Sequence, residues 1–364
     1  MNNTQKYHSY SGVIHIHSTY SDGSRNIPDI ASIANELDID FLLFTDHNTL
    51  KPKFDGLEGW YDKVLVGIGC EINDVSDQNH YLAFDIDEEV SWKLPPKEYV
   101  KKVGELGGFG IIAHPDEKRT TMPEYPIYPW TVWDSREFNG IELWNQMSEW
   151  MEGLNHLNKF YRFIHPRKSV AAPKKETLNK WDTLNLERKV IGIGGVDAHG
   201  HIYKLWGLFR ITIFRYKVLF RTIRTHVLLN EKLIKGENHQ KALHSLYGAL
   251  KNAQCYISNV ALGDAGDFRM IALSNREEVT IGGTVHLSDS LRLTVSAPQG
   301  EKIVLINNGE ILYEKSGEEA EFTPTKEGVY RVEVYKNRRP WIFSNHIRVV
   351  KKESLTQSSE VAKN

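Results

Sequence analysis

Residues 12–23 read Gly-Val-Ile-His-Ile-His-Ser-Thr-Tyr-Ser-Asp-Gly, an apolar run that ends in two histidines and a polar turn. His15 and His17 are two residues apart, and at that spacing both side chains lie on one face of a β-strand. Imidazole nitrogen binds zinc, iron and manganese, and Asp22 adds an anionic oxygen. The stretch predicts a metal-binding strand end. A strand with two hydrogen-bonded surface histidines is the alternative that this segment alone leaves open.

The same arrangement, an apolar run followed by a residue able to bind metal, recurs along the chain. The runs occupy residues 41–44, 64–70, 110–113 and 190–196, and the ligands that follow them are His47, Glu71, His114, Asp197 and His199. His80 opens a further run at 80–84. Between the runs, apolar spacing predicts helices at 27–37 and 99–106. This alternation predicts a parallel barrel, in which functional groups gather at the C-terminal ends of the strands.

Six short segments occur in a fixed order: His15-Ile16-His17-Ser18, Ser21-Asp22-Gly23, Thr45-Asp46-His47-Asn48, Glu71-Ile72, Ala113-His114-Pro115 and Asp197-Ala198-His199. In that order they resemble the motifs of the PHP (polymerase and histidinol phosphatase) superfamily of metal-dependent phosphoesterases. The resemblance covers about residues 10–258. Within the superfamily, the segment 339–345 and the β-rich C-terminal part are similar to the carbaryl-hydrolase-like branch.

The resemblance implies a distorted seven-stranded (β/α) barrel that holds two or three divalent ions (manganese, zinc or iron). It gives the first ion His15, His17, Glu71 and Asp197. The second ion shares Glu71 and adds His80 and His114, and the third takes Asp22, His47 and His199. A bridging carboxylate is a common way to hold two cations for hydrolysis, which agrees with this division. For His80 the alternative is an ordinary surface histidine.

Further residues near these motifs are candidates for roles other than metal binding. We expect Asp46 to accept a hydrogen bond from an imidazole N–H and so fix its tautomer. Glu142 and Asn145 end another strand-like run, and their role is open. Three residues could donate to a bound oxyanion, although turn or cap chemistry is the favoured explanation for each. These are Ser18, Ser21 and Asn48.

The predicted reaction is hydrolysis by a metal-activated hydroxide at a di- or trinuclear site. The expected substrate is a phosphomonoester or the phosphodiester of a nucleotide or short oligonucleotide. Hydrolysis of a carbamate, aryl ester or amide is the alternative, and a catalytically idle metal-binding scaffold is a third. A cationic pocket would favour phosphate esters, and an apolar pocket the alternative. His199, His201 or a metal-bound water could protonate the leaving group.

Composition narrows the class of protein. The net charge of −2 over 364 residues gives no general attraction to nucleic acid, so we predict no stable nucleic-acid complex. Cys70 and Cys255 are the only cysteines and form no CxxC pair, which favours a reducing cytoplasm. No signal-like segment and no run of about 20 apolar residues occurs, so no membrane association is expected. The oligomeric state is open.

The pattern also predicts domains. Residues 1–258 form the barrel, with about 116–188 as an inserted lid or pocket segment, and 259–350 form a small β-sandwich accessory domain. Asn308-Gly309 predicts a hairpin there, and the polar end, 351–364, is expected to be disordered. In the inserted segment Lys118, Arg119 and Arg136 could contact an anionic substrate, but solvated surface charge is the favoured explanation. Its aromatic residues could stack on a substrate, but packing is favoured: Tyr125, Tyr128, Trp130, Trp133, Trp144 and Trp150.

Overall fold

The computed structural model describes residues 7–205, 209–275 and 277–351. It is a mixed α/β protein whose largest sheet has 16 strands in these residues. One path through that sheet connects the strands of the N-terminal half. They are β1 (His8–Ile16), β2 (Phe41–His47), β4 (Val64–Ile72), β5 (Tyr81–Phe84), β6 (Phe109–Ile112), β7 (Gly140–Asn145) and β8 (Ile191–Gly195). The short β3 (Gly59–Tyr61) pairs with β4.

The direction of β5 departs from the predicted all-parallel order. The pairs β1–β2, β2–β4, β6–β7 and β7–β8 are parallel, but β5 runs antiparallel to both β4 and β6. A strand that runs the other way begins where its neighbours end. The start of β5 therefore lies at the same edge as the C-terminal ends of β4 and β6.

The segment after β8 returns to β1 through backbone hydrogen bonds. Val196 N donates to Ile14 O over 3.2 Å, and Ala198 N donates to His15 O over 3.2 Å. His17 N donates to Ala198 O over 3.0 Å. The first and last strands of the path therefore meet at the edge where the histidine-rich stretch ends. An exact seven-stranded barrel stays a prediction.

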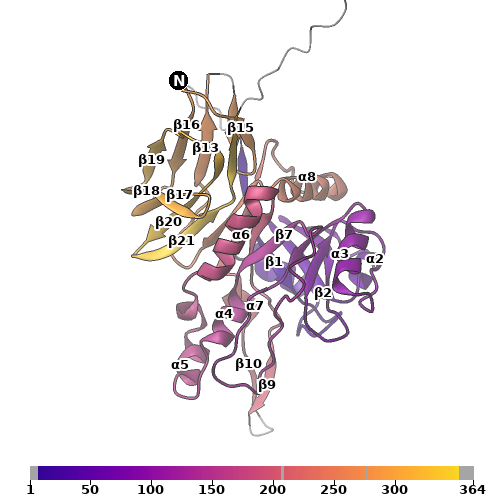
Figure 1. The fold of residues 1–364 in the computed structure, drawn as a ribbon. Coiled ribbons are helices and arrows are strands. Elements are labelled where there is room, and N and C mark those ends of the chain that lie inside the picture. The colour runs from indigo at the N-terminus through magenta and orange to yellow at the C-terminus, as the bar shows by residue number, and fades with distance from the viewer. Residues whose placement is uncertain (1–6, 206–208, 276, 352–364) are drawn as a thin grey trace, which may run out of the picture.

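Helices cover the outside of this part of the molecule (Figure 1). The first, α1 (Ile27–Asn35), begins where Asn26 accepts a hydrogen bond from Asp29 N, and it buries Ile27, Ile30 and other apolar residues. The predicted helices at 27–37 and 99–106 are confirmed with shifted ends. The other helices are α2 (Lys51–Phe54), α3 (Pro96–Glu105), α4 (Gln146–Glu152), α5 (Lys159–Ile164), the 3₁₀ helix η1 (Pro166–Ser169), α6 (Lys175–Glu187), α7 (Tyr216–Leu219) and α8 (His239–Lys251).

The predicted inserted segment contains a strand of the main sheet. β7 lies inside 116–188, pairs with β6 and β8, and is buried along its whole length. Only the flanking parts leave the sheet. In Figure 1, α4 and α5 lie with the β9 (Ile202–Leu205) and β10 (Phe209–Thr212) hairpin at the end of the molecule away from the C-terminal strands. None of the helices in the described ranges has the length and apolar character needed to span a membrane.

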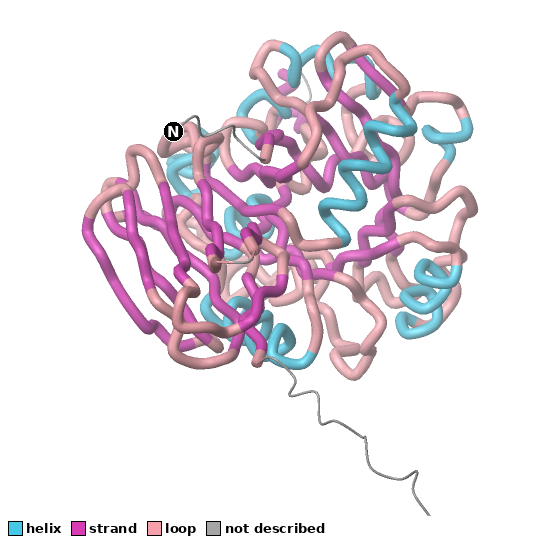
Figure 2. Tube along the Cα trace, turned by 90° about the horizontal axis from the view of Figure 1, so that it is seen from above, coloured by secondary structure: helices cyan, strands magenta, loops and turns pink. Residues whose placement is uncertain are grey.

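The C-terminal strands form two sheets packed on one core (Figure 2). A four-stranded sheet has the order β14 (Glu278–Thr280), β13 (Arg269–Leu273), β16 (Arg292–Ser296), β19 (Glu319–Phe322). The other strands belong to the large sheet: β15 (Thr284–His286), β17 (Lys302–Asn307), β18 (Glu310–Ser316), β20 (Gly328–Lys336), β21 (Arg339–Ser344) and β22 (Ile347–Val350). The Asn308-Gly309 hairpin is confirmed between β17 and β18, with φ of 53° and 85°.

The two halves share backbone pairing. β11 (Ile223–Leu229) pairs with β1, β12 (Cys255–Asn259) pairs with β11, and β21 pairs with β12. The large sheet therefore runs without interruption from the N-terminal half into the C-terminal strands. The sequence places its boundary at 258, in the middle of this pairing, so the domain limits remain a prediction. The predicted disordered tail lies, from residue 352, outside the described residues.

Candidate metal centre

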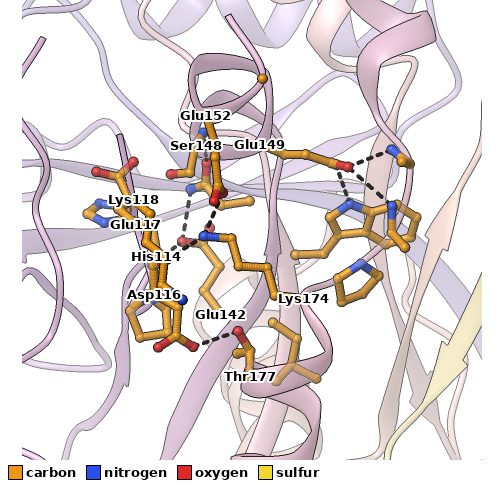
Figure 3. A pocket seen from close by; sticks show the side chains of 18 of the residues that line it. His114, Asp116, Glu117, Lys118, Glu142, Ser148, Glu149, Glu152, Lys174 and Thr177 are labelled. Carbon is orange, nitrogen blue, oxygen red and sulfur yellow. Dashed lines mark hydrogen bonds and ion pairs between the residues drawn. The ribbon is translucent and has the colours of Figure 1, made fainter. Parts of the chain in front are cut away.

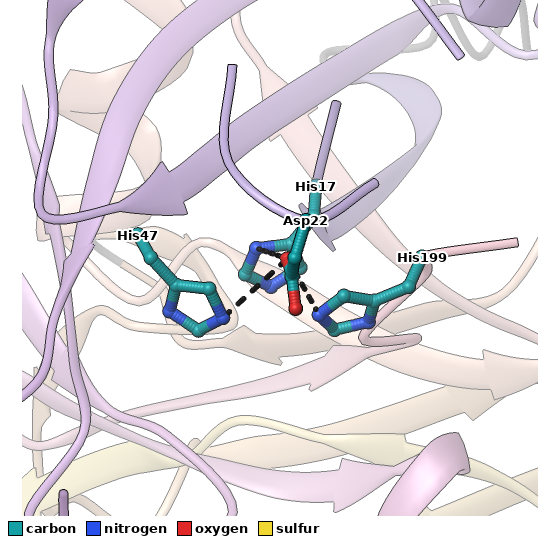
Figure 4. Close-up of side chains that lie close together, drawn as sticks. All are labelled: His17, Asp22, His47 and His199. Atoms are coloured by element: carbon teal, nitrogen blue, oxygen red, sulfur yellow. Dashed lines mark ion pairs between the residues drawn. The ribbon is translucent and has the colours of Figure 1, made fainter. Parts of the chain in front are cut away.

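All nine predicted ligands lie together at the edge where β1, β4 and β6 end. Their nitrogen and oxygen atoms form four overlapping groups that could hold a metal ion, each with its ligand atoms within 4.8 Å of one another. The groups are His15-His17-Glu71, His15-His114-Asp197, Glu71-His80-His114 and His17-Asp22-His47-His199. The expected third set is present with His17 added to it. Figure 4 shows this last group, in which three imidazoles surround the carboxylate of Asp22.

The backbone at the strand ends is unusual at three of the ligands. His15, His114 and Asp197 have φ of 67°, 27° and 53°, a region that residues other than glycine seldom adopt. At His15 the pairing between β1 and β2 also shifts register, as in a β-bulge. The two rings of His15 and His17 do converge, with centroids 5.3 Å apart, but simple strand alternation is not the reason. Such strain is typical of functional sites.

Glu71 is the carboxylate that connects the groups. One of its oxygens, Oε2, lies 3.2 Å from Nε2 of His15 and 3.2 Å from Nε2 of His17. The other, Oε1, lies 2.8 Å from Nδ1 of His80 and 3.3 Å from Nε2 of His114. Burial opposes ionisation of Glu71, but the surrounding imidazoles, His15 foremost, hold its pKa well below the usual range. Glu71 is therefore an anion with imidazoles on both oxygens.

Asp197 and Asp22 extend the cluster. Oδ1 of Asp197 lies 3.4 Å from Nε2 of both His15 and His17, and 3.4 Å from Nδ1 of His199. Burial opposes ionisation of Asp197, but these histidines keep its pKa well below the usual range. Asp22 is half exposed, and its Oδ1 lies 3.2 Å from Nε2 of His199. The cluster thus runs from a fully buried carboxylate to one that faces solvent.

The donor set fits divalent cations. Both ring nitrogens of His17 are buried and have no hydrogen-bond partner, and Nδ1 of His114 is in the same state. A buried polar atom without a partner is costly, and each such atom calls for an explanation. Imidazoles and carboxylates without a thiolate are suitable ligands for zinc, manganese or iron. Neutral imidazole is the form that binds metal, so a cation would displace protons that these carboxylates otherwise hold on the rings.

His80 lies in the cluster because β5 runs antiparallel. It is 4% exposed, so the alternative of a surface histidine does not hold. Burial opposes its protonation, but Glu71 and Asp77 raise its pKa to about 9. Asn73, which the sequence analysis did not single out, lies between two of the histidines. Its Oδ1 accepts from Nδ1 of His47 over 2.9 Å, and its Nδ2 lies 3.0 Å from Nε2 of His80.

The carboxylate that orients a histidine is Glu142, and the expectation for Asp46 is wrong. Glu142 Oε1 lies 3.0 Å from Nδ1 of His15, and its Oε2 accepts from His114 N over 2.9 Å. Asp46 instead accepts from Ser18 N over 2.8 Å and from two hydroxyl groups, those of Ser18 and Ser21, over 2.7 Å each. Its hydrogen bonds fold the turn after β1 and leave those two serines engaged. Only the position of Glu142 at a strand end hinted at its role.

Other candidate residues occupy the surroundings. His201 lines the cavity beside the cluster, and its ring stacks on that of His199 at 4.8 Å. Burial, with the neighbouring His199, lowers the pKa of His201. Asn48 is not among the residues that line the cavity, and its Oδ1 accepts from Asn73 N over 3.0 Å. Asn145 donates from Nδ2 to Glu142 Oε2 over 2.9 Å and caps α4.

A cavity of about 450 Å³ opens onto the cluster. The metal-ligand candidates form one wall. Asn73, Asp77 and Glu117 add further polar groups, and the remaining lining is mainly apolar and consists of Tyr125, Pro126, Tyr128, Met147, Trp150, Met151, Leu154, Phe163, Ile213 and Phe214. Three of the aromatic residues considered for stacking, Tyr125, Tyr128 and Trp150, are therefore at the cavity. Arg119 also lines it, and its side chain is only 7% exposed, so the expectation of a solvated surface charge is wrong.

A second cavity of about 430 Å³ is lined by His114, Glu142 and residues of the segments that follow them (Figure 3). Its polar groups largely engage one another. Thr177 donates to Asp116 Oδ2 over 2.6 Å, and Lys174 Nζ lies 2.5 Å from Glu152 Oε2. Glu149 accepts from Trp144 Nε1 over 2.8 Å. We therefore regard the first cavity as the candidate active site.

Comparison with known proteins finds distant similarity. No family model matches the chain. An uncharacterised protein of Methanocaldococcus jannaschii is 29% identical over 115 residues, a match that covers 28% of this chain and 66% of that protein, just under two thirds of its length.

Solved structures are similar at 13–14% identity. A two-domain protein from Bacteroides vulgatus, described as containing a predicted PHP-like metal-dependent phosphoesterase, covers 94% of this chain and 96% of its own at a TM-score of 0.43. A putative metal-dependent phosphoesterase from Bifidobacterium adolescentis covers 52% and 87% at 0.31. An amidohydrolase from Chromobacterium violaceum with bound sulfate covers 53% and 91% at 0.32. The function proposed below rests on the geometry of the site.

Proposed function

We propose that the protein is a metal-dependent hydrolase, and specifically a phosphoesterase. The observation that carries the proposal is the shared carboxylate of Glu71, which has imidazoles on both oxygens and opens onto a cavity. A carboxylate shared between neighbouring cation sites is characteristic of two-metal hydrolysis. The resemblance of six ordered motifs to the PHP superfamily supports the same reaction class.

The proposed reaction needs residues that hold the metal ions, residues that orient the ligands and residues that transfer protons. Two or three divalent ions would be held by the nine residues of the cluster, and when bound they supply Lewis acidity and lower the pKa of water. Glu142 orients the ring of His15, and Asn73 orients that of His47. His199 and His201 line the cavity, where either ring can pass a proton to a leaving group.

Hydrolysis of a carbamate, aryl ester or amide is the second candidate. The apolar wall of the cavity favours it, because such substrates are uncharged and often aromatic. It would also agree with the carbaryl-hydrolase-like branch. We also propose, for either candidate function, that the N-terminal part is a seven-stranded barrel, that the domain limits are those predicted from the sequence and that the protein resides in the cytoplasm.

The test is turnover by the protein reconstituted with manganese or zinc. Its substrates span phosphomonoesters, phosphodiesters, aryl esters and carbamates. Glu71→Ala is the site variant, and Glu314→Ala, on the half-exposed face of β18, is the matched control. We expect phosphate release that Glu71→Ala abolishes and Glu314→Ala preserves. Turnover confined to esters or carbamates would select the second candidate, and turnover independent of Glu71 would refute both.

A further inference from the structure

We propose that the cavity selects the phosphate monoester of an aromatic or similarly bulky apolar alcohol, and that Arg119 contacts an anionic oxygen of this substrate. The proposal rests on the proposed function and narrows it. It sets aside oligonucleotides and assigns Arg119 and the apolar wall roles in specificity. The supporting observations are the packing of the apolar wall, the contacts of the Arg119 guanidinium and the charged residues around the cavity.

The apolar wall is held in place on both sides. The ring of Tyr128 stacks on His80 with centroids 4.8 Å apart, and Tyr128 N donates to Glu117 Oε2 over 3.0 Å. Trp150 is 1% exposed, and Phe214 meets its ring edge to face at 4.5 Å. Phe163 lies 5.1 Å from the same ring. A packed aromatic surface in the same cavity as the metal-ligand candidates suits a flat apolar group attached to the reacting ester.

Arg119 is buried with much of its bonding capacity unused. Its Nε is buried without a hydrogen-bond partner. One Nη donates to Lys118 O over 3.3 Å, and the other lies 3.7 Å from Glu117 Oε1, too far for a hydrogen bond. A guanidinium has five N–H donors, and the ion pair with Glu117 and the long hydrogen bond to Lys118 O leave most of them without an acceptor. An oxyanion in the cavity would complete these bonds, as guanidinium pairs well with phosphate oxygens.

The charges around the cavity limit the number of phosphates that it suits. Among the described residues that line it, Arg119 is the only lysine or arginine, and outside the ligand cluster Asp77 and Glu117 add carboxylates. An oligonucleotide carries a charge on every phosphate and is normally met by several cationic side chains. One arginine together with the metal cluster matches a single phosphate group. The volume of about 450 Å³ is sufficient for that group and a ring system.

The test compares 1-naphthyl phosphate with glycerol 2-phosphate as substrates of the metal-reconstituted protein, and 1-naphthyl acetate is included as an uncharged ester of the same alcohol. Phe163→Ala removes part of the wall, and Phe160→Ala is the matched control on the same helix, because Phe160 is 73% exposed and does not line the cavity. Arg119→Gln removes the charge, and Arg119→Lys tests whether charge alone restores binding. Calorimetric titration with 1-naphthyl phosphonate, which is not hydrolysed, measures binding independently of turnover.

We expect kcat/KM for the naphthyl ester to exceed that for the glycerol ester by at least about 100-fold. Phe163→Ala should lower the naphthyl value by about 10-fold and leave the glycerol value unchanged, whereas Phe160→Ala changes neither. Arg119→Gln should weaken both esters and phosphonate binding by about 10- to 100-fold, with partial recovery in Arg119→Lys.

The outcomes separate this inference from the proposed function. Equal kcat/KM for the two phosphates, or an equal effect of Phe163→Ala on both, would overturn the proposed selectivity of the cavity for a bulky apolar alcohol. Turnover of 1-naphthyl acetate alone, unaffected by Arg119→Gln, would overturn the role of Arg119. If no ester is hydrolysed, phosphonate binding that both Phe163→Ala and Arg119→Gln weaken would support the pocket while the proposed function fails. Absence of phosphonate binding would overturn the inference.

Discussion

Two buried carboxylates in this molecule have contrasting surroundings. Asp182 of α6 accepts hydrogen bonds from Nε and one Nη of Arg331 over 2.7 and 2.9 Å. Its Oδ1 also lies 2.8 Å from Nε2 of His346. Glu71 has five imidazoles within 3.3 Å, and every ion-pair partner that the described residues give it is a histidine.

The difference separates a structural ion pair from a ligand site. Both oxygens of Asp182 are engaged by a guanidinium in a fork geometry that joins α6 to β20, so its charge is balanced within the chain. At Glu71 the partners are bases that are neutral when they bind metal, and His17 has no hydrogen bond through either nitrogen. Cations from outside the chain would balance the charge of the Glu71 cluster, whereas the Asp182 cluster needs none.

The largest effect that tests this comparison is expected from Glu71→Ala. We expect kcat to fall by at least about 10³-fold, because each site that shares this carboxylate is impaired. Metal content per folded molecule, measured by mass spectrometry after dialysis, should fall with it. Retention of metal and activity would mean that Glu71, like Asp182, has no part in metal binding.

Asp182→Asn should produce the opposite result. Removing the charge leaves Arg331 buried without its partner, which is expected to cost about 3–5 kcal/mol in the free energy of unfolding. Urea denaturation measures this loss. Activity and metal content per folded molecule should match those of the unmodified protein. A loss of metal at unchanged stability would contradict the structural role of this cluster.

Glu142→Gln should have an intermediate effect at the metal centre. Its carboxylate orients His15 without belonging to any of the four candidate groups, and such partners typically contribute about 10- to 100-fold to metal affinity or activity. Metal titration should show weaker binding, and excess metal should restore turnover. Glu149→Gln, at a buried carboxylate bonded to Trp144, is the control and should leave metal affinity unchanged. Equal effects of the two substitutions on metal affinity would show that Glu142 has no specific role in orienting His15.

A buried histidine without a carboxylate is expected to make stability depend on pH. His226 contacts Ser258 Oγ over 2.8 Å, and burial, with Arg224 and Arg269 nearby, lowers its pKa to about 3. Below about pH 6.5 the unfolded chain binds a proton that folded His226 does not, so stability falls as pH falls towards 3.

The slope due to this one group is at most about 1.4 kcal/mol per pH unit. Denaturation from pH 7 to pH 4 should show a shallower dependence for His226→Gln than for the unmodified protein. Comparing the two proteins cancels the contributions of all other titrating groups. Identical slopes would show that His226 titrates normally in the folded state.

Local sequence identified much of the site because the chemistry is carried by single residue types at strand ends. His15, His47, Glu71 and Asp197 each follow an apolar run, and the structure brings them together as expected. The hairpin at Asn308-Gly309 was predictable for a similar reason, since two adjacent residues supply the positive φ that the turn requires.

Residues that act through distant partners could not be assigned in this way. Glu142 is 127 positions from His15, and no periodicity relates them. Asp46 is a carboxylate next to His47 in the sequence and could therefore accept from an imidazole, yet the turn after β1 brings two serine hydroxyl groups to it instead. Arg119 appeared to be a surface charge because the exposure of a side chain depends on tertiary packing that the local sequence does not show.

The sequence by itself determined the metal-binding chemistry, the strand ends that carry it and the β-rich C-terminal part. These features depend on residue type and short-range spacing. Only the tertiary structure decided the direction of β5, the partners of Glu142 and Asp46, the burial of Arg119 and the pairing of β12 with β21. Each of these is set by packing between segments far apart in the chain, where many arrangements satisfy the same local pattern and the shared core selects one.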